Sequence, residues 1–133
     1  MNMDHLNVWA ILAATLSAFL VGGLWYSPVL LGRAWERANG FTESPKGGPK
    51  VFLLSFLLSL VMAVNLAFFL NDAKTTAAWG AIAGFLAGFG WVAMGLGVVA
   101  LFERRSWKYS LINGGYVTVA LTLMGLILGA WRK

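Results

Sequence analysis

Side chains that could carry catalysis or hold a metal are scarce in this sequence. Its 133 residues include one histidine, five acidic residues and no cysteine. Without cysteine there can be no disulfide, zinc–thiolate site, iron–sulfur cluster or thiol redox chemistry. The histidine, His5, has only Asp4 beside it, whereas a metal site needs three or four ligands. We therefore expect no enzyme activity, no metal and no cofactor.

The composition identifies the class of protein. Hydrophobic residues make up 59% of the chain, charged residues only 11%, and the mean hydropathy is +0.75. A soluble domain has about 25% charged residues. Such a composition cannot cover a surface that faces water, so soluble, disordered and fibrous classes are excluded.

Long stretches without charge predict the architecture. Four of them are 20 or more residues long, at 6–26, 51–70, 75–102 and 109–131. About 20 apolar residues cross the hydrocarbon core as a helix, which satisfies its own backbone hydrogen bonds. We therefore predict an all-α membrane protein, with residues 1–133 forming one domain of four transmembrane helices.

The long loop between the first two spans predicts a fifth, shorter helix at about 28–39. Ser27 is a good N-cap and Pro28 suits a first helical turn. Leu31, Trp35 and their neighbours then fall on one face and the charged residues largely on the other, while Gly40 is a typical stop signal. We expect this amphipathic helix to lie on the membrane surface.

The distribution of basic residues predicts the orientation. Seven basic residues lie in the loops after the first and third spans, and three lie on the other side of the predicted membrane. The seven are Arg33, Arg37, Lys46, Lys50, Arg104, Arg105 and Lys108; the three are Lys74, Arg132 and Lys133. Loops rich in lysine and arginine stay in the cytoplasm. We expect a bacterial inner-membrane protein with both termini on the periplasmic or extracellular side.

Glycine spacing gives the most specific packing signal. Gly80, Gly84 and Gly88 recur every four residues in the third span, and Gly95 continues the stripe. Gly125 and Gly129 form a milder version in the fourth span. Such stripes let helix backbones approach closely. They predict either packing within a four-helix bundle or a face for a homo-oligomer or another membrane subunit.

Two residues within the spans stand out from the apolar background. Asn65 lies well inside the second span, where an interhelical hydrogen bond or a substrate contact would explain it. Trp91 lies in the middle of the third span, where it either packs between helices or lines a pore or stacks on a cofactor. No Asp, Glu, Lys, Arg or His lies within any span, and ion-coupled transporters and proton pumps typically place such a residue there. Small multidrug exporters, which also have four spans, depend on a membrane-embedded glutamate that is missing here.

The basic loops allow two interpretations. One is contact with anionic lipid headgroups, which attract basic residues near the membrane surface, made by Arg33, Arg37, Arg104, Arg105 and Lys108. The other is a binding site for a phosphate-bearing ligand, formed by the four arginines of that set.

One segment resembles a known family. Residues 22–35 read Gly-Gly-Leu-Trp-Tyr-Ser-Pro-Val-Leu-Leu-Gly-Arg-Ala-Trp. This segment is similar to the signature of a bacterial membrane family known only as domain of unknown function 1761, although Leu31 stands where phenylalanine is expected. The resemblance implies the four-span fold and a shared site around this segment, but it brings no activity. We interpret the segment as a structural elbow at the membrane interface, formed by Trp25, Tyr26, Ser27, Pro28, Gly32 and Trp35.

These observations favour a self-associating or accessory membrane subunit. The alternative is a small oligomeric channel or carrier for a neutral or anionic solute. The expected partners are the lipid bilayer, anionic headgroups and a second copy or another membrane subunit, with no nucleic acid. Dry packing of the second and fourth spans would favour the first function, and a continuous polar path would favour the second.

Overall fold

The computed structural model describes residues 6–27, 30–40 and 49–131, which form helices joined by turns. The helices are α1 (Val8–Trp25), α2 (Gly32–Asn39), α3 (Pro49–Phe69), α4 (Ala77–Phe85), the π-helix η1 (Leu86–Ala93), α5 (Met94–Phe102) and α6 (Trp107–Ala130). α4, η1 and α5 follow one another without a break. Among the described residues, four helical stretches are therefore long and apolar enough to cross a membrane. The predicted fold class, four spans plus a short helix, is confirmed.

Polar side chains fix where three of these helices begin. The Asn7 side chain accepts a hydrogen bond from the backbone N–H of Trp9 (3.0 Å) and so caps α1. Thr76 caps α4 and Ser106 caps α6 in the same way, through their hydroxyl oxygens. Each cap satisfies a backbone donor that the first helical turn leaves without a partner.

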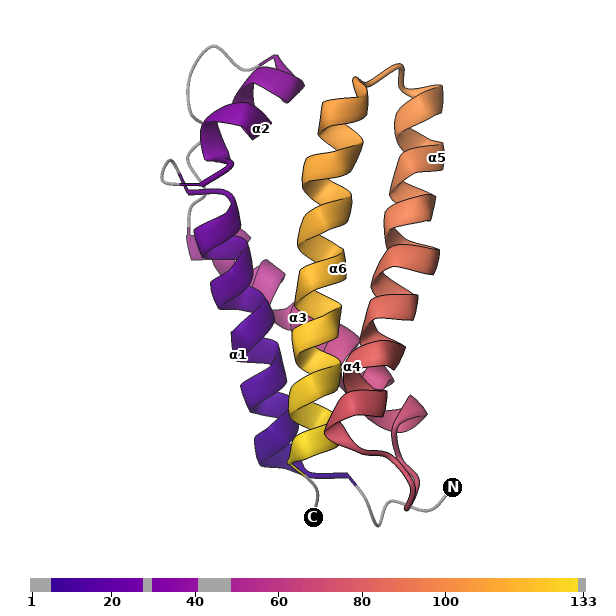
Figure 1. The fold of residues 1–133 in the computed structure, drawn as a ribbon. Helices are drawn as coiled ribbons and strands as arrows, with labels where there is room; N and C mark the ends of the chain where they lie inside the picture. Colours follow the sequence, from indigo (N-terminus) through magenta and orange to yellow (C-terminus); the bar gives the residue numbers. More distant parts are fainter. Residues whose placement is uncertain (1–5, 28–29, 41–48, 132–133) are drawn as a thin grey trace.

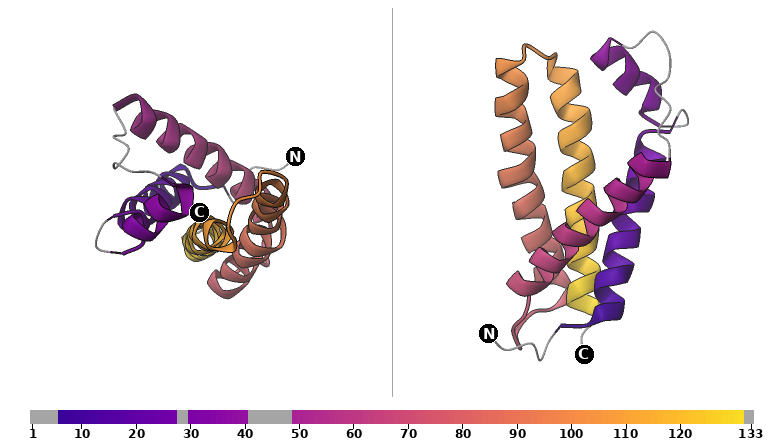
Figure 2. Two further views of the ribbon diagram at one scale, coloured as in Figure 1. Left: turned by 90° about the horizontal axis from the view of Figure 1, so that it is seen from above. Right: turned by 180° about the vertical axis from the view of Figure 1, so that it is seen from behind.

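Helix α6 lies at the centre of the bundle. It packs against α1 on one side and against α4 and η1 on the other (Figure 1). Seen from behind, α3 crosses α6 diagonally (Figure 2). Helix α2 and the α5–α6 turn lie at one end of the bundle (Figure 1), here named the basic end because α2 carries Arg33 and Arg37 and the turn carries Arg104 and Arg105. The start of α1, the α3–α4 turn and the end of α6 lie at the other end (Figure 1).

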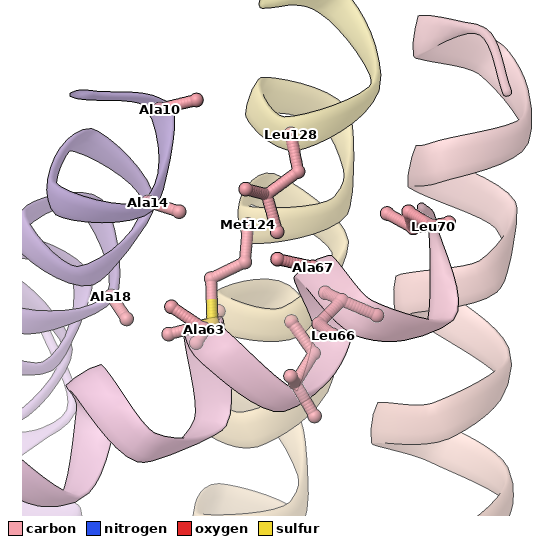
Figure 3. Packing of buried hydrophobic residues seen from close by; sticks show 11 residues of the cluster. Ala10, Ala14, Ala18, Ala63, Leu66, Ala67, Leu70, Met124 and Leu128 are labelled. Atoms are coloured by element: carbon pink, nitrogen blue, oxygen red, sulfur yellow. The ribbon is translucent and has the colours of Figure 1, made fainter. Parts of the chain in front are cut away.

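The core combines small residues with a few long side chains, among which Met124 is central. Buried alanines of α1 and α3 face α6, where the Met124 side chain is fully buried (Figure 3). These alanines are Ala10, Ala14, Ala18, Ala63 and Ala67. Because alanine occupies so little space, the helices approach closely, which favours association in lipid.

The short helix α2 begins later than expected. Its N-cap is Leu31, and Ser27 has a different role from the predicted one. The Ser27 hydroxyl donates to the carbonyl of Leu24 in the last turn of α1 (2.7 Å), while the Ser27 carbonyl accepts from the N–H of Gly32 (2.8 Å). Ser27 therefore closes the elbow before α2 starts, and Pro28 lies outside the described residues. Gly40 ends α2 with a φ of 73°, as its position predicted.

Candidate functional site

The signature segment forms an elbow that is hydrogen-bonded to α6. The indole N–H of Trp25 donates to the carbonyl of Ile112 (2.9 Å), and the hydroxyl of Tyr26 donates to the Asn113 side-chain oxygen (2.6 Å). Tyr26 is the C-cap residue that follows α1, and burial raises the pKa of its phenol. The two bonds tie the end of α1 to the first half of α6.

Aromatic rings fill the space between the elbow and α6. The Tyr26 ring meets Trp35 of α2 and Tyr116 of α6 edge to face, with both centroid distances 5.5 Å. Edge-to-face pairs of this kind stabilise beyond the area they bury. The ring cluster therefore holds α1, α2 and α6 together at the basic end.

Two glycines make the elbow tight. A Cβ on Gly32 would collide with the carbonyl oxygen of Tyr26, and one on Gly115 would lie 2.8 Å from the Trp25 ring. Sequence reasoning identified Gly32 but missed the α6 side of the elbow, namely Asn113, Gly115 and Tyr116. A polar residue followed by two glycines near a span end is the signal that could have pointed to it.

The glycine stripe packs inside the chain. A Cβ on Gly80, Gly84 or Gly88 would collide with the backbone of α6, close to Gly125, Leu121 and Thr118 respectively. A Cβ on Gly129 would collide with the carbonyl oxygen of Thr76. Of the two interpretations of the stripe, the structure therefore supports intramolecular packing.

Gly95 does not belong to this stripe, contrary to expectation. It is exposed, and a Cβ there would meet no atom within 4 Å. The cause is η1, because a π-helical turn takes one more residue than an α-helical turn and so rotates the residues C-terminal to it. The buried positions after Gly88 are therefore Ala93 and Ala100, which are 8% and 2% exposed.

The basic residues form two groups at the basic end. Arg33 and Arg37 are exposed on α2, and Arg104, Arg105 and Lys108 are exposed in and beside the α5–α6 turn. Two of the second group lie over aromatic rings: the Arg105 guanidinium is 5.2 Å from the Tyr109 ring centre, and the Lys108 ammonium is 5.9 Å from that of Trp107. The α6 helix lies between α2 and α5 (Figure 2), so the four arginines come from opposite sides of α6.

Two grooves open on the surface of the bundle. The first, the α3 groove, has a volume of about 430 Å³ and lies between α3 and α4–η1, lined among others by Met62, Asn65, Phe69, Trp79, Leu86 and Trp91. The second, the α5–α6 groove, has a volume of about 440 Å³ and is lined among others by Phe89, Met94, Gly97, Trp107, Leu111 and Val119. Both are in the size range of ligand sites, which is roughly 300–1,000 Å³.

The two residues that stood out within the spans both line the α3 groove. Trp91 is 72% exposed, so it does not take the predicted place between helices of this chain. The Asn65 amide donates to the carbonyl of Val61 in its own helix (2.9 Å), in place of the expected interhelical bond. The groove lies beside the diagonal helix α3, and both side chains belong to its lining.

The described residues contain no cluster of histidine and acidic side chains that could hold a metal. His5 lies outside the described residues. Within 6–27, 30–40 and 49–131, the buried polar side chains are Thr15, Ser59 and Thr75. The described residues therefore form packing surfaces and grooves. Few of their side chains could take part in a chemical reaction.

Comparison with known proteins gives a family. A family model described as a protein of unknown function (DUF1761) matches residues 9–129, and the chain belongs to this family. No curated protein and no solved structure matches it.

Proposed function

We propose that this member of the DUF1761 family is a self-associating subunit of the bacterial inner membrane, in which two copies pair through their α3 grooves. Both termini lie on the outer side of the membrane in this proposal, and the chain has no enzyme activity. The observation that carries it is the position of Asn65, a carboxamide exposed on an apolar groove within a membrane span.

A carboxamide in the hydrocarbon core is stabilised by a hydrogen-bond partner, which lipid chains cannot provide. Asn65 uses one N–H on its own helix, at the carbonyl of Val61. Its side chain also has a second N–H and an oxygen that accepts. Asparagine hydrogen bonds between transmembrane helices contribute about 0.6–2 kcal/mol. Such a partner has to come from outside this chain's bundle.

The chemistry of the amide favours a second copy of the same chain. A carboxamide carries both donor and acceptor, so two Asn65 side chains related by a two-fold axis can exchange hydrogen bonds. Two-fold interfaces bring the same surface of each subunit together. Trp79 and Trp91 line the same groove, so their rings supply large apolar contacts for a second copy.

The shape of the bundle agrees with this pairing. Helix α3 packs mainly on α1, has only sparse contact with α6 and leaves α4–η1 at a distance. Its exposed face carries Leu58, Val61 and Phe69 in addition to Asn65. A second α3 laid across this face would bury these side chains together with the groove.

The packing favours a subunit over the alternative, a channel or carrier. The hydroxyls of Thr118 and Thr122 in α6 donate to carbonyls one turn earlier in their own helix. The buried cluster between α1, α3 and α6 consists mainly of alanine, leucine and methionine side chains. A polar path would have to form at an oligomer axis from other residues.

Disulfide trapping tests the proposed interface, because the chain has no cysteine of its own. We expect Val61→Cys, one turn from Asn65 on the same exposed face of α3 and with the carboxamide kept, to form a covalent dimer on mild oxidation in native membranes. The matched control is Leu16→Cys, an exposed residue in the middle of α1 that lines neither groove. Equal cross-linking of both variants, or none of Val61→Cys, would overturn the proposal.

A second experiment tests the amide itself. We expect Asn65→Leu to weaken dimerisation about tenfold in detergent, measured by mass as a function of concentration, because roughly 1.4 kcal/mol corresponds to that factor. Asn65→Gln keeps the carboxamide and should retain more of the dimer. If Asn65→Leu dimerises as well as the parent, a hydrogen bond through Asn65 plays no part. A heterologous membrane subunit copurifying in place of the dimer would replace self-association by an accessory role.

A further inference from the structure

The α5–α6 groove is apolar and extends over half the membrane. It is lined from Trp107 at the start of α6 to Val119 near its middle. At 1.5 Å per residue this part of α6 is about 18 Å long. Half of the roughly 30 Å hydrocarbon core is about 15 Å. The groove therefore matches the depth of the leaflet at the basic end.

The groove exists because α5 separates from α6. Close packing of α4 and η1 on α6 depends on their glycines and on Ala93, which meets Gly114. Beyond that contact α5 approaches α6 less closely, and the two helices diverge towards the basic end (Figure 1). Gly97 lines the gap, and a Cβ on it would meet no atom within 4 Å.

Cations surround the mouth of this groove. Arg104 and Arg105 lie in the turn that joins α5 to α6, and Lys108 lies in the first turn of α6. Trp107 is both a wall of the groove and the ring beneath the Lys108 ammonium, so a positive charge sits directly beside the apolar wall. One carboxylate, Glu103, accompanies the three cations.

The α3 groove provides an internal contrast. It is equally apolar and opens towards the opposite end, where the α3–α4 turn carries Lys74 and Asp72. The Asp72 carboxylate accepts from the Lys74 backbone N–H (2.8 Å), and the two formal charges offset each other. Only the α5–α6 groove combines an apolar channel with an excess of positive charge at its mouth among the described residues.

We propose that the α5–α6 groove binds one anionic phospholipid. One acyl chain lies along the groove between α5 and α6, and the phosphate lies among Arg104, Arg105 and Lys108. Charge complementarity selects the headgroup, and the depth of the groove selects a lipid chain over a soluble anion. Basic pockets between transmembrane helices on the cytoplasmic side bind anionic headgroups in this way. This site is separate from the α3 groove and does not depend on self-association.

Native mass spectrometry of the full chain, with added phosphatidylglycerol or phosphatidylcholine, tests the headgroup part. We expect one phosphatidylglycerol to bind at least about tenfold more tightly than phosphatidylcholine, because each basic residue contributes to the attraction. The triple variant Arg104→Gln, Arg105→Gln, Lys108→Gln should lose this preference. The matched control, Lys74→Gln, removes a cation at the other end and should keep it. Equal binding of both lipids by the parent would overturn the proposal.

A second set of variants tests the groove. Gly97→Leu places a side chain in the groove without changing any charge and should abolish tight binding of phosphatidylglycerol. Val119→Phe fills the deep end and provides an independent check should Gly97→Leu fold poorly, with thermal stability measured for both. Unchanged phosphatidylglycerol binding by a folded blocking variant would refute the acyl-chain site. Displacement of the lipid by inorganic phosphate at equal concentration would also refute it, because the site would then bind anions without the chain.

Discussion

Gly80 and Gly125 face each other so closely that neither position has room for a Cβ. A Cβ on Gly80 would collide with the carbonyl oxygen of Gly125, and a Cβ on Gly125 would collide with that of Gly80. α4 and α6 are thus in backbone-to-backbone contact. In lipid, such close contact drives association, because there is little hydrophobic gain between helices. The stripe is used within the chain, so the proposed self-association relies on another surface, the α3 groove.

This contact predicts that alanine destabilises the protein at the stripe glycines and does not do so at a nearby exposed glycine. We expect Gly84→Ala to lower the stability by about 1–3 kcal/mol or more, because its Cβ would collide with the carbonyl oxygen of Leu121. The matched control is Gly90→Ala in the same continuous helix, where a Cβ would meet no atom within 4 Å. The control should be neutral or stabilising by up to about 1 kcal/mol. Thermal unfolding in detergent measures both, and equal melting temperatures would show that α4 does not pack on α6 through this face.

The spans could be predicted from the sequence, because each is an uncharged stretch of membrane length. The intervals of four residues from Gly80 to Gly88 likewise predicted a close helix contact. Nothing in the composition predicted η1, since a π-turn changes the facing residues without changing the hydropathy. For that reason Gly95 was assigned to the stripe, whereas Ala93 and Ala100 occupy it.

Only the α1 side of the elbow could be predicted from the sequence. The motif around Trp25 and Tyr26 indicated an elbow, but its partners on α6 depend on how α1 and α6 pack, which a single sequence does not specify. The two grooves depend on the diagonal course of α3 and on the separation of α5 from α6. These are tertiary relationships, and Asn65 acquires its significance only when the open groove beside it is known.

The geometry of the elbow predicts that alanine destabilises the protein at one glycine of the signature segment and not at another. Gly32→Ala should destabilise the protein by about 1–3 kcal/mol, because its Cβ would collide with the carbonyl oxygen of Tyr26. Gly23→Ala is the matched control, since a Cβ on Gly23 would meet no atom within 4 Å. Thermal unfolding in detergent, followed by intrinsic Trp fluorescence, measures the stability of both variants. The same loss of stability in both variants would mean that the tight turn at Gly32 is unimportant.

The orientation can be tested with single cysteines at the two ends of the bundle. Ser106→Cys lies in the α5–α6 turn, and Ala73→Cys lies exposed in the α3–α4 turn. Seven of the ten basic residues lie in or beside the segments that follow the first and third spans, so the end formed by α2 and the α5–α6 turn should face the cytoplasm. A membrane-impermeant thiol reagent should therefore label Ala73→Cys in intact cells, and Ser106→Cys only after the cells are opened. Labelling of Ser106→Cys in intact cells would reverse the topology.

The π-helix η1 predicts that the deletion of one residue is tolerated within η1 but not in α5. Buried Gly88 and Ala93 are five positions apart, one more than an α-helical turn allows. Deleting Gly90 shortens this interval to four and should convert η1 to α-helix, with Ala93 and Ala100 still facing α6. Deleting Gly97 instead rotates Ala100 and everything after it by about 100°. That rotation would turn Ala100, which is 2% exposed, out of its buried position and would misplace the α5–α6 turn that follows it.

Both deletions remove one exposed or half-buried glycine from the same continuous helix, so chain length and composition are matched. We expect deletion of Gly90 to leave the melting temperature in detergent almost unchanged. Deletion of Gly97 should lower it by about 5–10 °C, which corresponds to roughly 2 kcal/mol for a chain of this size. If the two deletions lower the melting temperature equally, the extra residue in η1 is needed for more than the register of α5. If both are harmless, the packing of Ala100 on α6 contributes little to the stability of the bundle.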